Sequence, residues 1–118
     1  MPLPLPPKFY LPLALSVVAA FVVLFTPASG VPSGFQHSDK IVHFALFAAL
    51  SYTSRVAAIS FARTALWTGV FAIVSEIVQA SLPIGRSGSP LDALFDVLGV
   101  AAGLLVAMRL VPARSAIH

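Results

Sequence analysis

Four long apolar segments divide the chain. They run from about Tyr10 to Thr26, Ile41 to Ile59, Ala65 to Leu82 and Ala93 to Val111. Each has roughly 17–20 residues, enough for a helix to cross a hydrocarbon core of about 30 Å. Lipid offers no partner to unpaired backbone groups, and these segments lack the period-two alternation of a membrane β-strand. The pattern therefore predicts an all-α, polytopic membrane protein built as a bundle of four transmembrane helices.

The connections between the apolar segments carry residues that interrupt helices. Pro, Gly and Ser are concentrated in residues 27–34 and 83–90, which predicts two longer loops. The second and third segments are joined by a few residues around Ser60–Thr64, which predicts a tight antiparallel hairpin. We expect a Pro-rich cytoplasmic N-terminus at residues 1–9, a transmembrane domain at 10–111 and a cytoplasmic tail at 112–118. An alternative is that the first apolar segment is a signal peptide ending near residues 28–30.

The composition supports a membrane location and excludes several classes of protein. Of the 118 residues, 58% are hydrophobic and 9% are charged, and the mean hydropathy is +0.97. A soluble domain carries about 25% charged residues, and the few charged side chains here cannot cover the surface of a soluble fold of this size. This argues against a soluble enzyme, a disordered chain and a nucleic-acid-binding protein. The chain has no Cys, so it has no disulfide, no thiolate zinc site and no thiol nucleophile.

The basic residues predict an orientation in the membrane. If the segments alternate in direction, one side carries most of the Lys and Arg residues, namely Lys8, Arg55, Arg63, Arg109 and Arg114. The other side carries Lys40 and Arg86. Because cytoplasmic loops are enriched in Lys and Arg, we expect a multi-pass protein of the bacterial inner or plasma membrane with both termini in the cytoplasm. The two longer loops then face outward.

All the acidic residues lie on or near the outer half of the predicted bundle: Asp39, Glu76, Asp92 and Asp96. An ionised side chain inside the bilayer is costly and is rarely kept without a partner or a task. We therefore predict a small polar pocket that opens outward, with Lys40 and Arg86 at its rim. The side chains expected inside it are His43, Glu76, Gln79 and Asp96. With His neutral, the outer half carries a net charge of −2 and the cytoplasmic side +5.

These residues also have purely structural explanations. Asp39 and Asp92 are placed where acids stabilise the N-terminus of a helix. Glu76 could form an ion pair with Arg86, and Gln79 could hydrogen bond to another helix. A purely structural network would be spread along the bundle rather than gathered at one end, so we favour a functional pocket.

Two glycines in the last segment predict a helix contact. Gly99 and Gly103 follow Asp92 and Asp96 along one face of the predicted helix. Their four-residue spacing lets two helices approach closely. We therefore expect them to be helix-packing residues.

The polar residues also carry a family resemblance. Their order and spacing are Asp39-Lys40-x-x-His43-Phe44, Glu76-x-x-Gln79, Gly85-Arg86-Ser87, Ser89, Asp92 and Asp96-x-x-Gly99-x-x-x-Gly103. Over about residues 36–105, this pattern resembles the VanZ-like family, small bacterial membrane proteins named for a teicoplanin-resistance accessory protein. The resemblance implies a polytopic protein of the cell envelope, related to a glycopeptide-resistance protein, and no settled reaction. Where the family commonly has Asn in the last span this chain has Asp96, so the pocket's charge can differ from that of relatives.

The function we favour is a non-catalytic envelope protein that binds a lipid head group, a glycan precursor or a membrane partner. The residues expected to bind it are Asp39, Lys40, Gln79, Arg86, Asp92 and Asp96. Arg86 would contact phosphate or carboxylate through its planar guanidinium group, and Lys40 would act as a point charge.

Two other functions stay open. One is a membrane-embedded enzyme acting on a lipid-linked or phosphate-bearing envelope substrate, with His43 or Glu76 as the catalytic general base. The other is a small dimeric proton-coupled exporter. Exporters of this size use an acid in their first span, and here no charged residue lies between Lys8 and Asp39.

Cofactors and partners follow from the same residues. Asp39, His43, Asp92 and Asp96 offer oxygen and imidazole donors for a divalent metal. No known metal motif has this spacing, so we expect no metal and no other cofactor. The expected partners are membrane lipid and either a lipid-linked substrate or a membrane protein, with no nucleic acid. A homo-oligomer is left open.

Overall fold

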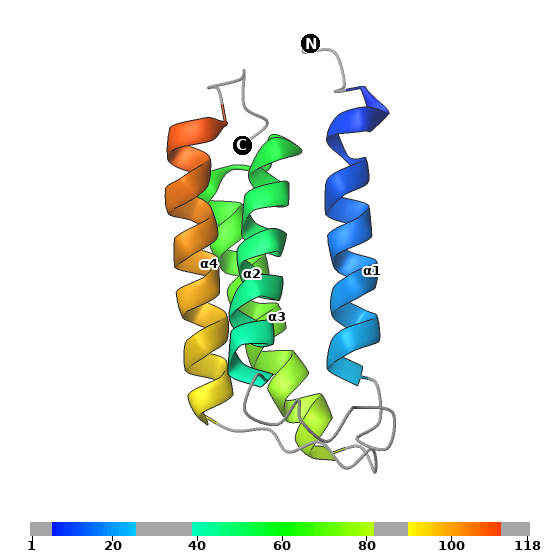
Figure 1. Cartoon of the computed structure of the whole chain (residues 1–118), viewed down its shortest axis with the longest axis vertical. Coiled ribbons are helices and arrows are strands. Elements are labelled where there is room, and N and C mark those ends of the chain that lie inside the picture. The colour runs from blue at the N-terminus through cyan, green and yellow to red at the C-terminus, as the bar shows by residue number, and fades with distance from the viewer. Residues whose placement is uncertain (1–5, 26–38, 82–89, 112–118) are drawn as a thin grey trace.

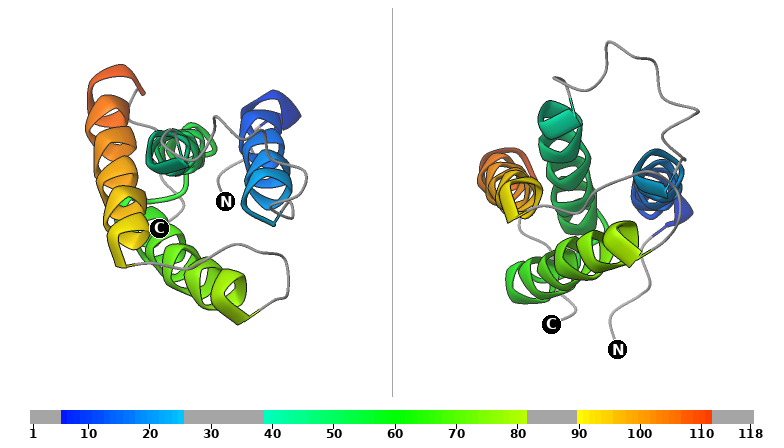
Figure 2. Two further views of the ribbon diagram at one scale, coloured as in Figure 1. Left: turned by 60° about the horizontal axis from the view of Figure 1, so that its bottom comes forward. Right: turned by 90° about the horizontal axis from the view of Figure 1, so that it is seen from below.

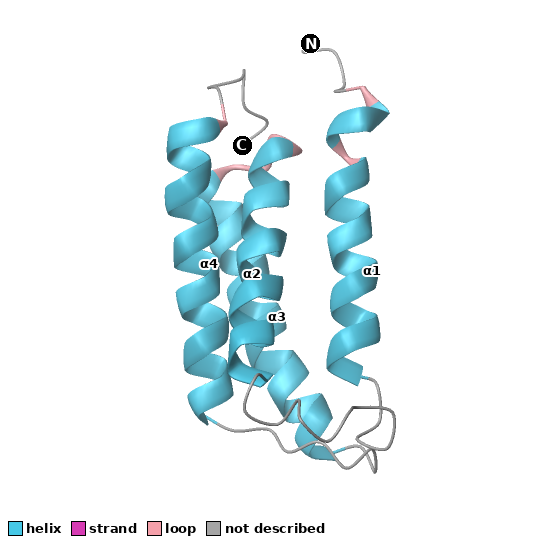
Figure 3. Cartoon of the chain, in the orientation of Figure 1, coloured by secondary structure: helices cyan, strands magenta, loops and turns pink. Residues whose placement is uncertain are grey.

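Helices make up nearly all of the described chain. The computed structural model describes residues 6–25, 39–81 and 90–111. A short 3-10 turn, η1 (Pro7–Phe9), precedes α1 (Leu11–Phe25), α2 (Asp39–Val56), α3 (Phe61–Ser81) and α4 (Pro90–Leu110). These described ranges contain no strand (Figure 3), which confirms the all-α class. The proposed signal-peptide end at 28–30 and the tail at 112–118 lie outside them.

The four helices alternate in direction along one bundle (Figure 1). At one end α2 turns into α3, α1 begins and α4 ends, and we call this the hairpin end. At the opposite end α1 and α3 end while α2 and α4 begin, and we call this the polar end. The alternation confirms the antiparallel arrangement predicted from the apolar segments.

Three of the helical segments are long and apolar enough to cross a membrane: Pro7–Phe25, Phe61–Ser81 and Leu91–Leu110. The remaining helix, α2, has 18 residues but includes Asp39, Lys40 and Arg55. It runs beside the other helices over the same stretch of the bundle (Figure 1). The all-α, polytopic four-helix bundle is confirmed, and membrane crossing by α2, its least apolar member, stays a prediction.

The arrangement makes α2 the central helix. Seen along the bundle in Figure 2, α2 lies between α4 and α1, and α3 crosses along one side. Its most extensive contacts are with α4. Buried apolar side chains from all four helices form the core, namely Ala20, Leu24, Phe47, Leu50, Ala72, Val100 and Leu104. The outward faces carry large exposed apolar residues such as Leu15, Leu66 and Leu105, as expected of helices solvated by lipid.

The close contact between α2 and α4 depends on the two glycines. A Cβ added at Gly99 would collide with the backbone carbonyl of Phe44. One added at Gly103 would collide with the carbonyl of Ala48 and the hydroxyl of Ser51. These glycines therefore let the two backbones approach more closely than any larger residue would allow.

The hairpin lies slightly earlier in the chain than the sequence predicted. The link spans residues 57–60 rather than about 60–64, because α2 ends at Val56 and α3 already begins at Phe61. Ala58 adopts a left-handed conformation with φ 63°, which is the geometry of a helix C-terminal cap. The amide of Ala58 donates to Arg55 O, and that of Ile59 donates to Ser54 O. The residues Ala57-Ala58-Ile59 carry no turn signal, so the apolar pattern alone extends the predicted helix through them.

Candidate functional site

The candidate site lies at the polar end, where three helices place polar side chains at one level. The first turns of α2 supply Lys40 and His43, and those of α4 supply Asp92 and Asp96, one helical turn apart. The last part of α3 supplies Glu76 because this helix runs in the opposite direction. His43, Glu76, Asp92 and Asp96 are all buried. We call these five residues the polar cluster.

The shortest contact of the polar cluster joins α2 and α4. Nδ1 of His43 lies 2.7 Å from Oδ1 of Asp96, and both side chains are almost completely removed from solvent. With Asp96 ionised, the imidazole N–H donates to the carboxylate. This contact fixes the orientation of the imidazole ring.

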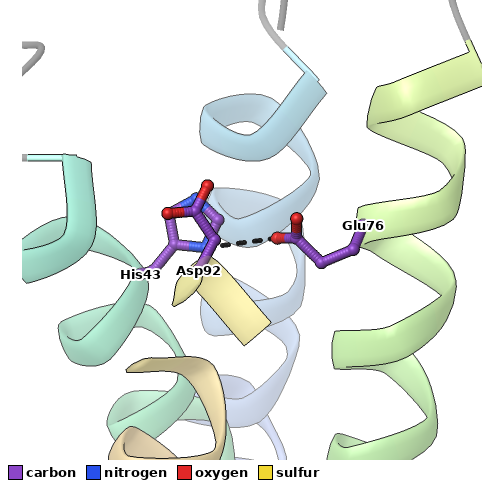
Figure 4. Close-up of side chains that lie close together, drawn as sticks. All are labelled: His43, Glu76 and Asp92. Carbon is purple, nitrogen blue, oxygen red and sulfur yellow. Dashed lines mark ion pairs between the residues drawn. The ribbon is translucent and has the colours of Figure 1, made fainter. Parts of the chain in front are cut away.

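Glu76 approaches the same imidazole from α3. Its Oε1 lies 3.8 Å from Nδ1 of His43, and Figure 4 shows the two side chains pointing toward one another with Asp92 beside them. Donor atoms of His43, Glu76 and Asp92 all lie within 4.8 Å of one another. Three helices therefore converge on one small volume that holds one imidazole and two carboxylates.

Lys40 forms the edge of the cluster. Its Nζ donates to Oδ1 of Asp92 over 3.3 Å, and its side chain is 38% exposed, whereas that of Asp92 is 7% exposed. The positive ends of the α2 and α4 dipoles also lie here, which favours the carboxylate of Asp92 in the first turn of α4.

Gln79 has a different role from its neighbours. Its Nε2 donates to the backbone carbonyl of Leu24 over 2.7 Å. Leu24 is in the last turn of α1, where carbonyl groups lack a partner within their own helix. Gln79 thus ties the end of α1 to α3. This is the interhelical hydrogen bond that the sequence offered as a purely structural explanation for Gln79.

The other predicted site residues are placed only in part. Asp39 is the first residue of α2, but its side chain lies outside the described residues, as does the whole of Arg86. Among the described residues, the structure gathers His43 and Asp92 with Glu76, which was not among the possible metal donors Asp39, His43, Asp92 and Asp96 of a chain expected to hold no metal. The spacing of Glu76 to the other acids along the chain gave no sign of this.

A match to a known family covers this whole region. The family model described as VanZ/LLP1 matches residues 8–111, which include all four helices and the polar cluster. The chain belongs to the VanZ/LLP1 family. This membership confirms the resemblance deduced from the polar motifs, and the apolar helices confirm a membrane protein. No curated protein and no solved structure matches the chain significantly.

The chemistry available to this VanZ/LLP1 protein follows from the donors in the cluster. A buried imidazole held by a carboxylate is the arrangement that orients a general base or a metal ligand. Carboxylates in a lipid-enclosed site bind cations or accept hydrogen bonds from hydroxyl groups. The partly exposed Lys40 amine can contact an anion that approaches from outside the bundle.

Proposed function

We propose that this VanZ/LLP1 protein is an envelope membrane protein whose polar cluster binds the phosphate-bearing head group of a lipid. The observation that carries the proposal is the convergence of His43, Glu76, Asp92 and Asp96, from three helices, at one end of the bundle. Polar residues at the opposite end mostly bond within their own helix, so packing alone does not require such a network. A shared site for a polar ligand explains why the cluster exists.

The rim of the cluster favours a phosphate. Lys40 is partly exposed beside Asp92, and the N-termini of α2 and α4, which attract anions, lie at the same level. Arg86 precedes α4 by a few residues in the sequence, and we propose that its planar guanidinium, which suits phosphate oxygens, joins this rim. Head-group hydroxyls would donate to the carboxylates behind this rim.

Phosphate-lipid binding can be tested on the purified full-length protein with dihexanoyl phosphatidic acid, measured by isothermal titration calorimetry. We expect Lys40→Met and Arg86→Met each to weaken binding by about tenfold, the usual effect of one lost charge-assisted contact. Lys8→Met, at the hairpin end, removes the same charge and is the matched control. Equal affinities in all three variants would refute the proposal. An uncharged dihexanoyl glycerol and inorganic phosphate show whether the tails or the phosphate dominate.

We also propose that the polar end faces outward and both termini lie in the cytoplasm. This orientation is supported by the described basic residues, since Lys8, Arg55, Arg63 and Arg109 lie toward the hairpin end and Lys40 toward the polar end. A reporter fused after Arg63 is expected to be cytoplasmic, and one fused after Gly88 external. The reverse pattern would place the cluster on the cytoplasmic side and remove envelope lipids of the outer leaflet as ligands.

A second candidate function is an enzyme acting on a phosphate-linked envelope lipid. The observation that favours it is the 2.7 Å contact between His43 and Asp96, with Glu76 3.8 Å away, because a base held by a carboxylate is common in acid–base catalysis. Release of phosphate from a lipid phosphate by wild-type protein, lost in His43→Gln while head-group binding persists, would identify the enzyme. Binding without any turnover leaves the non-catalytic function.

A further inference from the structure

We infer that His43, Glu76 and Asp92 form a binding site for one divalent transition-metal cation. The three side chains come from α2, α3 and α4, are buried, and hold donor atoms within 4.8 Å of one another. Figure 4 shows them gathered around one point between the helices. This ligand set differs from any that the chain's local motifs predict, because its members are far apart in the sequence.

The distances suit a site that closes on a metal. Ligand atoms around a tetrahedral metal are about 3.4 Å apart when each metal–ligand bond is about 2.1 Å. The present separations, up to 4.8 Å, require movements of about 1 Å, which the flexible Glu76 side chain can supply by rotamer changes. Asp96, 2.7 Å from the imidazole, holds the ring as a carboxylate holds many metal-bound histidines.

The charge of the cluster also favours a cation. Among the described residues of the cluster, Glu76, Asp92 and Asp96 together with Lys40 carry a net charge of −2 with His neutral. One divalent ion balances this charge. Buried charges in a membrane bundle are tolerated when they are paired or when they coordinate an ion.

The donor types select the class of metal. One imidazole and two carboxylates suit Mn²⁺, Fe²⁺ or Zn²⁺, whereas Mg²⁺ and Ca²⁺ prefer sites made of oxygen alone. The inference deepens the proposed function, because a cation bound by the carboxylates adds positive charge beside the phosphate that Lys40 contacts and strengthens its binding. The metal site rests on the proposed function only in that both use the polar cluster.

Metal binding is tested without lipid, so its outcome is separate from that of head-group binding. Purified full-length protein is stripped with EDTA and titrated with Mn²⁺, and bound ion is followed by electron paramagnetic resonance, with Zn²⁺ as competitor. We expect one Mn²⁺ per chain, displaced by Zn²⁺ and not by equimolar Mg²⁺, and a rise in the thermal midpoint with metal. Head-group binding measured in EDTA reports on the proposed function alone.

Substitutions assign the ion to the three ligands. Glu76→Gln and Asp92→Asn keep size and hydrogen-bonding capacity, and each is expected to weaken Mn²⁺ binding at least tenfold, as is His43→Ala. Ser75→Ala is the matched control: Ser75 is buried beside Glu76 in the chain, but its hydroxyl bonds to the carbonyl of Ala72. Absence of saturable Mn²⁺ or Zn²⁺ binding at millimolar concentration overturns the inference. So does binding that survives in the Glu76→Gln, Asp92→Asn double variant. If His43→Ala fails to fold, the two conservative variants decide.

Discussion

The two ends of this bundle use polar side chains in opposite ways. Toward the hairpin end they mostly bond to their own helix: Thr53 donates to Ala49 O, Ser54 to Leu50 O and Thr68 to Thr64 O. At the polar end the ionisable residues and Gln79 bond across helices, although Ser75 and Ser81 still bond within α3. His43 contacts Asp96 over a separation of 53 residues, and Gln79 reaches Leu24 O over 55.

Hydrogen bonds within a helix let a polar side chain be buried, whereas hydrogen bonds between helices determine how the helices are arranged. A hydroxyl that bonds to a carbonyl one turn back satisfies itself in any packing of its helix, so it can be buried in lipid without selecting a fold. A side chain that bonds across helices is satisfied only in one arrangement. The polar end therefore fixes how α1, α2, α3 and α4 are placed, and it concentrates the groups that can act on a ligand.

The largest effect is expected where α2 and α4 touch. Gly103→Leu would push a side chain into the carbonyl of Ala48, which has no room to move, and should cost about 3 kcal/mol of unfolding free energy. Gly69→Leu is the matched control, since nothing lies within 4 Å of the Cβ position on Gly69 in α3. Unfolding titrations in SDS, followed by Trp67 fluorescence, measure both. Equal losses would show that the glycine contact does not hold the two helices together.

The sequence predicts those features of the structure that depend on the composition of single segments. Hydrophobic length alone predicts four helices, and the basic residues predict that their ends alternate. Neither depends on contacts between helices. The end of α2 could not be predicted because Ala58 occupies a left-handed position that usually carries glycine.

The sequence predicts which end of the bundle carries the polar residues, but not which of their side chains contact one another. Four acids and a histidine at one level are visible in the sequence once the helices alternate. Their pairing is not, since it depends on how α2, α3 and α4 are rotated about their axes. The partner of Gln79 is a backbone carbonyl of Leu24, and a backbone acceptor leaves no mark in the sequence.

The next effect concerns the cross-helix pair. Asp96→Leu leaves the buried His43 imidazole without its carboxylate and should lower the unfolding free energy by about 2–3 kcal/mol. Asp96→Asn retains an acceptor for the imidazole N–H and should recover most of that loss. SDS unfolding of the two variants checks this. If Asn destabilises as much as Leu, the charge of Asp96 rather than its hydrogen bond is what matters.

A smaller effect is expected at the link between α3 and α1. Gln79→Leu removes the 2.7 Å bond to Leu24 O and should cost about 1 kcal/mol, because interhelical hydrogen bonds in membranes contribute little individually. The loss should be local. Hydrogen exchange is expected to rise in the last turn of α1, with the amides of α2 and α4 unchanged. Faster exchange throughout the bundle would mean that Gln79 supports the whole fold.

The smallest effect on stability is expected for Thr68, in the part of α3 nearer the hairpin end. Its size tests the difference between the two ends of the bundle. Thr68 is completely buried, as Asp96 is, yet Thr68→Val should change the unfolding free energy by less than about 0.5 kcal/mol. The carbonyl of Thr64 that accepts its hydroxyl keeps its bond within the helix, and valine has nearly the same shape. A loss as large as that of Gln79→Leu would contradict the comparison, because hydroxyls bonded to their own helix would then specify the fold as strongly as the polar cluster.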